Sequence, residues 1–157
     1  MSMSLSSGAF ERNERIPIQF TGEGRDVSPP LAWSGIPSKA KELALIMEDP
    51  DAPIPEPWVH WVIYRIAPSL SGLPEGVAKT ATFAAPVSML QGKNSWGAIG
   101  YRGPAPPKGH GVHRYSLRLY ALDAPLKLPS GATKSELLKA MQGHILSQTE
   151  LIGTYER

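Results

Sequence analysis

The sequence has no cysteine among its 157 residues, which excludes disulfide bonds, cysteine-ligated zinc, iron–sulfur clusters and thiol chemistry. It also lacks an apolar run of bilayer length, and its first residues lack the basic and apolar segments of a secretory signal. We therefore expect a cytoplasmic protein with no membrane span. The net charge is only +2, and the lysines and arginines are scattered, so nucleic acid is not an expected partner.

The length and composition predict one domain, residues 1–157, with a real hydrophobic core. Hydrophobic residues make up 41% of the chain and charged residues 19%, which is ordinary for a globular protein. The 16 prolines and 15 glycines are spread along the whole sequence. This spread indicates many short elements joined by turns, so we predict a mostly β fold.

Four segments rich in β-branched, aromatic or apolar residues are predicted strands, and a closing segment returns to alternation. The only well-signalled helix follows the capping-box pattern Thr133-Lys134-Ser135-Glu136. Gly143 leaves the end of that helix undetermined. The predicted strands are Ile16–Phe20, Leu43–Glu48, Val59–Ile66, Tyr115–Leu122 and Glu150–Tyr155.

Two aspartates follow the second apolar run, in the motif Asp49-Pro50-Asp51-Ala52-Pro53. The prolines stiffen this turn, so its carboxylates are held with little entropy loss when a ligand binds. For this motif taken alone the structural interpretation is favoured, because aspartate beside proline often accepts hydrogen bonds from nearby backbone amides.

His60 lies in the apolar stretch Trp58–Tyr64. Regular strand alternation would place His60 with Val62 and Tyr64 on one face, and Val59 with Trp61 and Ile63 on the other. His60 is then either a satisfied core histidine or a site residue. Trp58 enters from a proline-rich segment, and its indole either walls a pocket or covers the core.

A long Gly-Pro segment, residues 97–111, precedes Val112-His113-Arg114-Tyr115. Its glycines permit backbone amides to approach a ligand closely, which favours an anion. His113 and Tyr115 should share one face of a strand, while Arg114 on the other face makes an ion pair or binds carbonyls. The alternative is a long surface loop before an ordinary strand.

Taken together, these motifs resemble the phosphatidylethanolamine-binding protein family, specifically its bacterial and archaeal Raf-kinase-inhibitor-like branch. The resemblance extends over nearly the whole chain. It is carried by Asp26-Val27-Ser28-Pro29-Pro30-Leu31 with Trp33, Asp49-Pro50-Asp51-Ala52-Pro53, His60-Trp61, Asn94-Ser95-Trp96-Gly97 with Gly100-Tyr101, Gly103-Pro104 with Pro106-Pro107, and His113-Arg114-Tyr115 leading to Leu119-Tyr120-Ala121-Leu122-Asp123.

The resemblance implies antiparallel Greek-key β-sheets with one or two short helices, and a small pocket for phosphate-like anions or phospholipid head groups. It implies a binding or regulatory protein rather than an enzyme, with no cofactor and no metal. A kinase or protease could be a protein partner, and a homodimer is one option. The residues carried over to the pocket are Asp49, Asp51, Pro53, Trp58, His60, Gly103, Pro107, His113 and Tyr115.

The rival hypothesis is a metal-dependent hydrolase, because two aspartates and two histidines could hold a divalent ion and activate water. No zinc-protease, serine-hydrolase or phosphate-loop motif occurs in the sequence to support it. In the anion-binding hypothesis, Asp49 beside His60 or His113 favours the imidazolium form, which donates to phosphate oxygens. Binding should then weaken as the pH rises and the histidines lose their protons.

Overall fold

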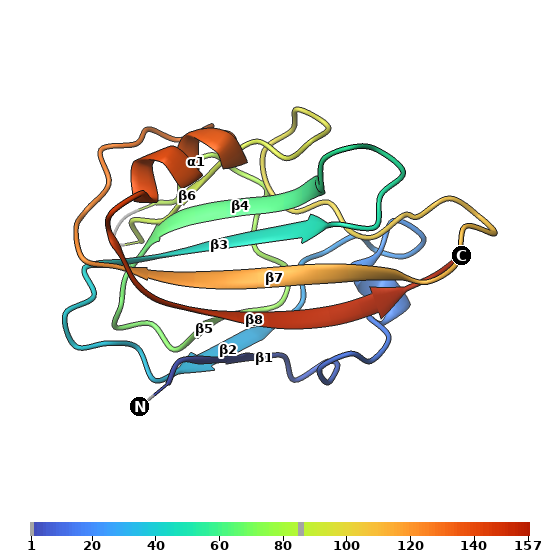
Figure 1. Cartoon of the computed structure of the whole chain (residues 1–157), viewed down its shortest axis with the longest axis horizontal. Helices are drawn as coiled ribbons and strands as arrows, with labels where there is room; N and C mark the ends of the chain where they lie inside the picture. Colours follow the sequence, from blue (N-terminus) through green and yellow to red (C-terminus); the bar gives the residue numbers. More distant parts are fainter. Residues whose placement is uncertain (1, 85–86) are drawn as a thin grey trace.

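The computed structural model describes residues 2–84 and 87–157, which fold into two antiparallel sheets and one α-helix (Figure 1). The predicted mostly β, antiparallel architecture is confirmed. The smaller sheet has the order β1-β2-β5 and the larger has the order β6-β4-β3-β7-β8. Their bounds are β1 Ser4–Ser6, β2 Leu31–Ser34, β3 Glu42–Asp49, β4 Trp58–Ile66, β5 Gly72–Leu73, β6 Leu90–Gln91, β7 His113–Leu122 and β8 Ile145–Tyr155.

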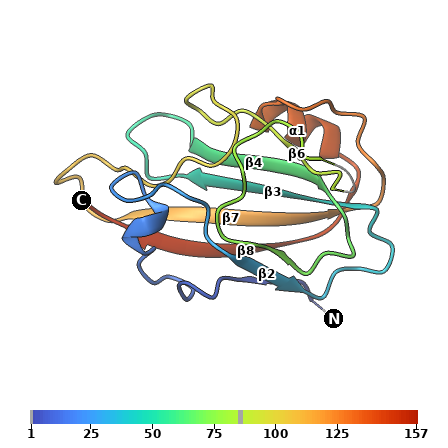
Figure 2. The same cartoon turned by 180° about the vertical axis from the view of Figure 1, so that it is seen from behind.

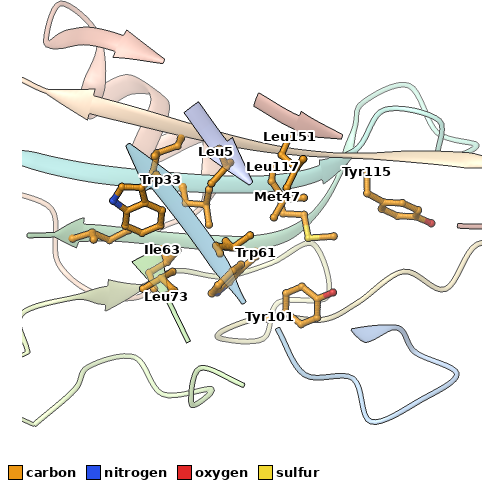
Figure 3. Close-up of a cluster of buried hydrophobic side chains, with 14 of the residues drawn as sticks. Leu5, Trp33, Met47, Trp61, Ile63, Leu73, Tyr101, Tyr115, Leu117 and Leu151 are labelled. Carbon is orange, nitrogen blue, oxygen red and sulfur yellow. The ribbon is translucent and has the colours of Figure 1, made fainter. Parts of the chain in front are cut away.

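The main core lies between the two sheets and contains side chains from both (Figure 3). Leu5, Trp33 and Leu73 come from the smaller sheet, and residues such as Met47 and Leu117 come from the larger one. Seen from behind in Figure 2, β2 crosses in front of the larger sheet. Burial of this apolar surface is the dominant favourable contribution to folding.

The opposite face of the larger sheet packs against the helix α1, Lys134–Met141, through a second cluster that includes Ala44, Ile46, Leu137 and Met141. Strand β3 is therefore covered on both faces, which explains its nearly continuous apolar sequence. Odd-numbered positions of β3 from Leu43 to Met47 face the main core. The alternation carries Asp49 to that same face at the strand's end.

Helix α1 begins where the sequence predicts. The Thr133 side chain accepts a hydrogen bond from the Glu136 backbone amide, and the Glu136 carboxylate accepts one from the Thr133 amide. The helix ends at Met141, and after Gly143, with φ +83°, the chain enters β8 at Ile145. Strand β8 is thus longer than the predicted Glu150–Tyr155. Among the described residues, no helix is long and apolar enough to span a bilayer.

The predicted strand Ile16–Phe20 is wrong, because residues Ile18–Phe20 form a 3-10 helix. Pro17 lacks the amide that a central strand needs, and the Phe20 amide instead donates to the Pro17 carbonyl. The apolar residues of this segment do not lie on one face as they would in a strand. Ile16 and Phe20 are buried, whereas Ile18 is 55% exposed. Four further strands of two to four residues, β1, β2, β5 and β6, are not among those predicted from the sequence.

Candidate functional site

The first component of the site is Asp49, the last residue of β3. Its side chain is only 5% exposed, and its Oδ2 lies 2.6 Å from Nδ1 of His113 on the neighbouring strand β7. The other carboxylate oxygen accepts a hydrogen bond from the Asp51 amide at 2.8 Å. One Asp49 oxygen therefore stabilises the turn, as the structural interpretation predicts, while the other orients a histidine.

His60 reaches the same site through an irregularity in β4. Met47 pairs with Trp61, but Glu48 pairs with Val59, so His60 is an extra residue in β4. Such an insertion reverses the side-chain alternation beyond it. Val59 consequently packs in the second cluster, whereas Trp61 is in the main core.

The predicted division of faces around His60 is therefore wrong. His60 does not point to the face of Val62 and Tyr64, which belong to the second cluster. Its ring instead packs edge-to-face against Tyr115, a residue of the main core, with centroids 5.3 Å apart. The inserted residue turns His60 toward Asp49 and His113, where regular alternation would have turned it away.

His113 and Tyr115 lie two residues apart on β7 and share a face, as the sequence predicts. Their rings stack with centroids 6.4 Å apart, and both residues are buried. Because β7 is antiparallel to β3, the beginning of β7 lies beside the end of β3. This strand order brings the two sequence motifs together into one site.

The pocket at this site has a volume of about 190 Å³. Its polar side chains are at one end, and its other walls are largely apolar. The Trp58 and Trp96 indoles pack edge-to-face at 5.3 Å, and Trp96 also packs against His60. The lining residues are Asp49, Ala52, Pro53, Ile54, Trp58, His60, Trp96, Ala105, Pro106, Pro107, His113 and Tyr115.

The environment of His60 fixes its hydrogen-bonding role. Burial lowers the pKa of His60 below its usual value, and its hydrogen bond to the Arg102 carbonyl only partly opposes that shift. Nδ1 lies 2.6 Å from the Arg102 carbonyl oxygen. A carbonyl can only accept, so Nδ1 carries the hydrogen. In the neutral ring, Nε2 is therefore an acceptor for any ligand.

Tyr115 offers the complementary group. Burial, and next the negative charges of Asp49 and Asp51, raise the pKa of Tyr115, which keeps its phenol protonated. Its hydroxyl makes no hydrogen bond to the residues that the structure describes. Figure 3 shows this ring at the edge of the core cluster, with the hydroxyl directed away from Met47 and Leu117. Tyr115 can thus donate a neutral hydrogen bond.

Two of the nine predicted site residues lie outside the pocket lining. Asp51 binds Arg114, with its Oδ1 2.8 Å from Nη2 and its Oδ2 3.0 Å from Nε. The Arg114 side chain holds the pKa of Asp51 down at about 2. The ion pair predicted for Arg114 is confirmed, and Asp51 supports the first motif from outside the pocket.

Gly103 also lies outside the lining and has a structural reason to be glycine. Its amide donates to Asp26 Oδ1 at 2.6 Å, and a Cβ here would meet the Phe20 carbonyl oxygen at 2.1 Å. Five lining residues are not among those predicted: Ala52, Ile54, Trp96, Ala105 and Pro106. Trp96 was visible in the motif Asn94-Ser95-Trp96-Gly97, but nothing local indicated that this loop lies beside β4.

The metal hypothesis finds no support in the arrangement of ligands. Within residues 2–84 and 87–157, no group of three or more histidine or acidic side chains could hold a metal ion. Asp49 and His113 contact each other directly, and His60 is bonded to a backbone carbonyl. The polar groups thus offer hydrogen-bond donors and acceptors for a small ligand.

Comparison with known proteins gives a consistent result. The family model described as phosphatidylethanolamine-binding protein matches residues 6–156. A UPF0098 protein from Methanothermobacter thermautotrophicus is 50% identical over 155 residues, which cover 99% of each chain. A UPF0098 protein from Pyrococcus abyssi is 48% identical over 96% of this chain and 84% of its own.

Solved structures show the same fold over the full length. A putative phosphatidylethanolamine-binding protein homologue from Chlamydia trachomatis is 42% identical with a TM-score of 0.89, covering 99% of this chain and 98% of its own. Escherichia coli YbcL, described as a member of the mammalian family, is 27% identical with a TM-score of 0.91, covering 100% and 99%. A carboxypeptidase Y inhibitor, solved in complex with its proteinase, is more distantly similar, with a TM-score of 0.52 at 16% identity. The match covers 98% of this chain and 82% of the inhibitor, and it concerns the fold alone.

Proposed function

Because the chain belongs to the phosphatidylethanolamine-binding protein family, we propose that it is a binding protein whose pocket accepts a phosphate-like anion or the phosphate of a phospholipid head group. Family membership supports the general statement that this is a binding-type protein. The choice of ligand rests on the pocket itself. The observation that carries it is the buried pair of Asp49 and His113, in contact at 2.6 Å at the polar end of the pocket.

The donors and acceptors in the pocket suit a phosphate group. Since Asp49 accepts from His113 Nδ1, protonation of His113 would place a second donor on Nε2. A charged donor of this kind binds phosphate oxygens more strongly than a neutral one does. The Tyr115 hydroxyl is a further donor, and neutral His60 Nε2 can accept a hydrogen from a protonated phosphate or an ammonium group.

The size of the pocket suits a head group rather than a whole lipid. Its volume of about 190 Å³ is below the roughly 300–1,000 Å³ that encloses a drug-sized ligand. The indoles of Trp58 and Trp96 and the prolines of the rim would contact the glycerol or methylene part of such a ligand. Inorganic phosphate and glycerophosphoethanolamine share the same phosphate chemistry, and separate titrations distinguish them.

The direct test is calorimetric titration of the full chain at pH 6 with inorganic phosphate, with dimethyl phosphate and with glycerophosphoethanolamine. We expect binding by the wild type and a loss of about tenfold or more in His113→Ala, because a charge-assisted hydrogen bond is removed. His113→Gln serves as a second variant if alanine unfolds the chain. His144→Ala is the matched control, since His144 pairs with Asp123 at 2.9 Å and does not line the pocket.

The pH dependence has a definite sign. A phosphodiester keeps its charge over the range in which imidazole titrates, so a fall in dimethyl phosphate affinity as the pH rises would report on the protein. An affinity that stays flat or rises with pH, or a folded His113→Ala variant that binds as well as the wild type, would overturn the proposal. Metal analysis and a phosphoesterase assay on the same preparation test the hydrolase alternative.

Regulation of a kinase or protease, and formation of a homodimer, both stay predictions. Recovery of partners from native cells with wild type and with the Asp49→Ala and His113→Ala variants would show whether the pocket mediates such an interaction. Identical recovery would separate the pocket from any partner.

A further inference from the structure

One histidine outside the pocket lining touches the site directly. Nδ1 of His110 lies 2.6 Å from Nε2 of His113, with ring centroids 4.8 Å apart. The two contacts of His113 therefore form a chain, Asp49–His113–His110, in which every link is 2.6 Å long. His110 thus contacts His113 Nε2, the ring nitrogen that would otherwise donate to an anion.

The positions of the hydrogens on these three side chains determine how the Asp49–His113–His110 series responds to an added proton. The Asp49 carboxylate accepts from His113 Nδ1, so a neutral His113 has a lone pair on Nε2, and His110 Nδ1 donates to it. One added proton is accommodated, since charged His113 can donate Nε2–H to a neutral His110. A second proton leaves two N–H groups facing each other, and the direct contact must break.

The loop around His110 leaves room for His110 to move away from His113. His110 is exposed, and it is flanked by Gly109 at φ +75° and Gly111 at φ +94°. A Cβ at either glycine would meet nothing within 4 Å, so open space surrounds both positions. The sequence marks this Gly-His-Gly motif, but no packing requirement explains the histidine. His113, in contrast, is buried and held by Asp49.

We infer that His110 is a second anion-binding residue, which gives up its direct contact with His113 and joins it as a paired imidazolium donor when a phosphate group binds. This inference rests on the proposed function and adds to it a further ligand residue and a two-proton requirement. The anion would lie between the two rings and accept from both nitrogens that now face each other. Each imidazolium then finds a negative partner in place of a positive one.

The surrounding charges favour this arrangement. On β3 and the following turn are Asp49 and Asp51, and on β7 are Arg114 and Tyr115. Arg114 neutralises Asp51 through their ion pair, so that Asp49 remains as the negative partner of His113.

The cationic side chains nearest His110 in the sequence and in the loop contacts are Lys108 and Arg157. The third histidine of the site, His60, lies on β4. Lys108 is two residues from His110, and a main-chain oxygen of Arg157 accepts from the Gly109 amide at 3.2 Å. The Arg157 side chain donates to the Pro106 carbonyl, which leaves its positive charge near the loop. An anion between His110 and His113 would therefore have the buried Asp49 carboxylate on the strand side, beyond His113.

The test is calorimetric titration of the full chain with dimethyl phosphate between pH 5 and pH 8, the range in which histidine side chains titrate. If two histidines gain protons on binding, the logarithm of affinity falls with a slope approaching two per pH unit on the alkaline side. In His110→Asn the slope should fall toward one, with affinity at pH 6 lower by about tenfold. His144→Ala should keep the wild-type slope.

The outcomes separate this inference from the proposed function. If the wild type binds none of dimethyl phosphate, inorganic phosphate and glycerophosphoethanolamine at any pH, both are overturned. Binding that needs His113 but has the same slope and affinity in His110→Asn overturns the role of His110 and leaves the pocket intact. A second readout, the imidazole nitrogen resonances of His110 on saturation with dimethyl phosphate, must move toward the doubly protonated form; unchanged resonances would also overturn it.

Discussion

The buried histidines of the pocket have different hydrogen-bond partners, although they lie on the same face of one sheet. His113 Nδ1 donates to the Asp49 carboxylate, whereas His60 Nδ1 donates to a backbone carbonyl in a place where burial lowers the pKa of the ring. A ligand therefore meets one histidine held by a carboxylate and another held by a backbone carbonyl. The pair could not be assigned these roles from residue type alone.

His60 gives a prediction at this scale. Its pKa should lie below the ordinary value of 6.5, and its ring should carry the hydrogen on Nδ1. Nitrogen-detected NMR of the assigned histidines measures both properties, with the exposed His144 for comparison. Stability linked to His60 would be complete above pH 6.5 and would fall as the pH drops from there to the folded-state pKa, because only the unfolded chain gains a proton. Titration above 6.5, or hydrogen on Nε2, would contradict the assigned environment.

The two aspartates show how far local sequence can predict a site. The motif Asp49-Pro50-Asp51 identifies two carboxylates beside a strand end, yet only Asp49 enters the pocket. Alternation along β3 accounts for Asp49, whereas the position of Asp51 depends on Arg114, a residue on another strand. A long-range ion pair of that kind has no signal in the residues around Asp51.

At the scale of elements, one inserted residue decides the composition of the site. The periodicity of β4 predicts a strand correctly but assigns His60 to the wrong face, because the register shift opposite Met47 and Glu48 depends on pairing with β3. The ladder is regular at the beginning of β7 and needs no such correction, and there His113 and Tyr115 share the predicted face. Strand periodicity predicts faces only where the ladder is regular.

Helix α1 supports a prediction of its own, because it packs on the face of the sheet opposite the pocket. Thr133→Ala removes the side-chain cap and should destabilise the protein by about 1 kcal/mol. Denaturant unfolding measures this change, and Ser135→Ala, inside the first turn, is the matched control. Anion affinity should be the same in both variants. A tenfold loss of affinity in Thr133→Ala would show that α1 and the pocket are coupled.

At the scale of the whole molecule, the pocket lies where two distant parts of the chain meet. The apolar runs of β3 and β4, the turn residues and the capping box are sufficient to predict a mostly β chain with one helix. The order β6-β4-β3-β7-β8 follows from packing across the complete sheet and has no local signal. The short strands of the smaller sheet were missed for the same reason, since two to four residues form no period.

The C-terminal strand reaches the pocket loop, and this contact yields a prediction for the whole molecule. Arg157 Nε donates to the Pro106 carbonyl at 2.6 Å, next to Pro107 in the pocket wall. Arg157→Ala should weaken anion binding by roughly two- to tenfold and speed amide exchange around residues 105–110, because one hydrogen bond to the loop is lost. Lys39→Ala, in an exposed turn, is the control. Unchanged affinity and exchange would show that the loop holds its shape without Arg157.

The division of the pocket between distant segments has a further consequence. Asp49 and His60 belong to the first half of the chain, and His113 and Tyr115 belong to the second half. A polypeptide cleaved between β4 and β7 would carry half of the anion site on each fragment, and neither fragment would hold the Asp49–His113 pair. Recovery of binding on mixing the fragments would then measure their reassociation, so the pocket could serve as an internal reporter of fragment complementation.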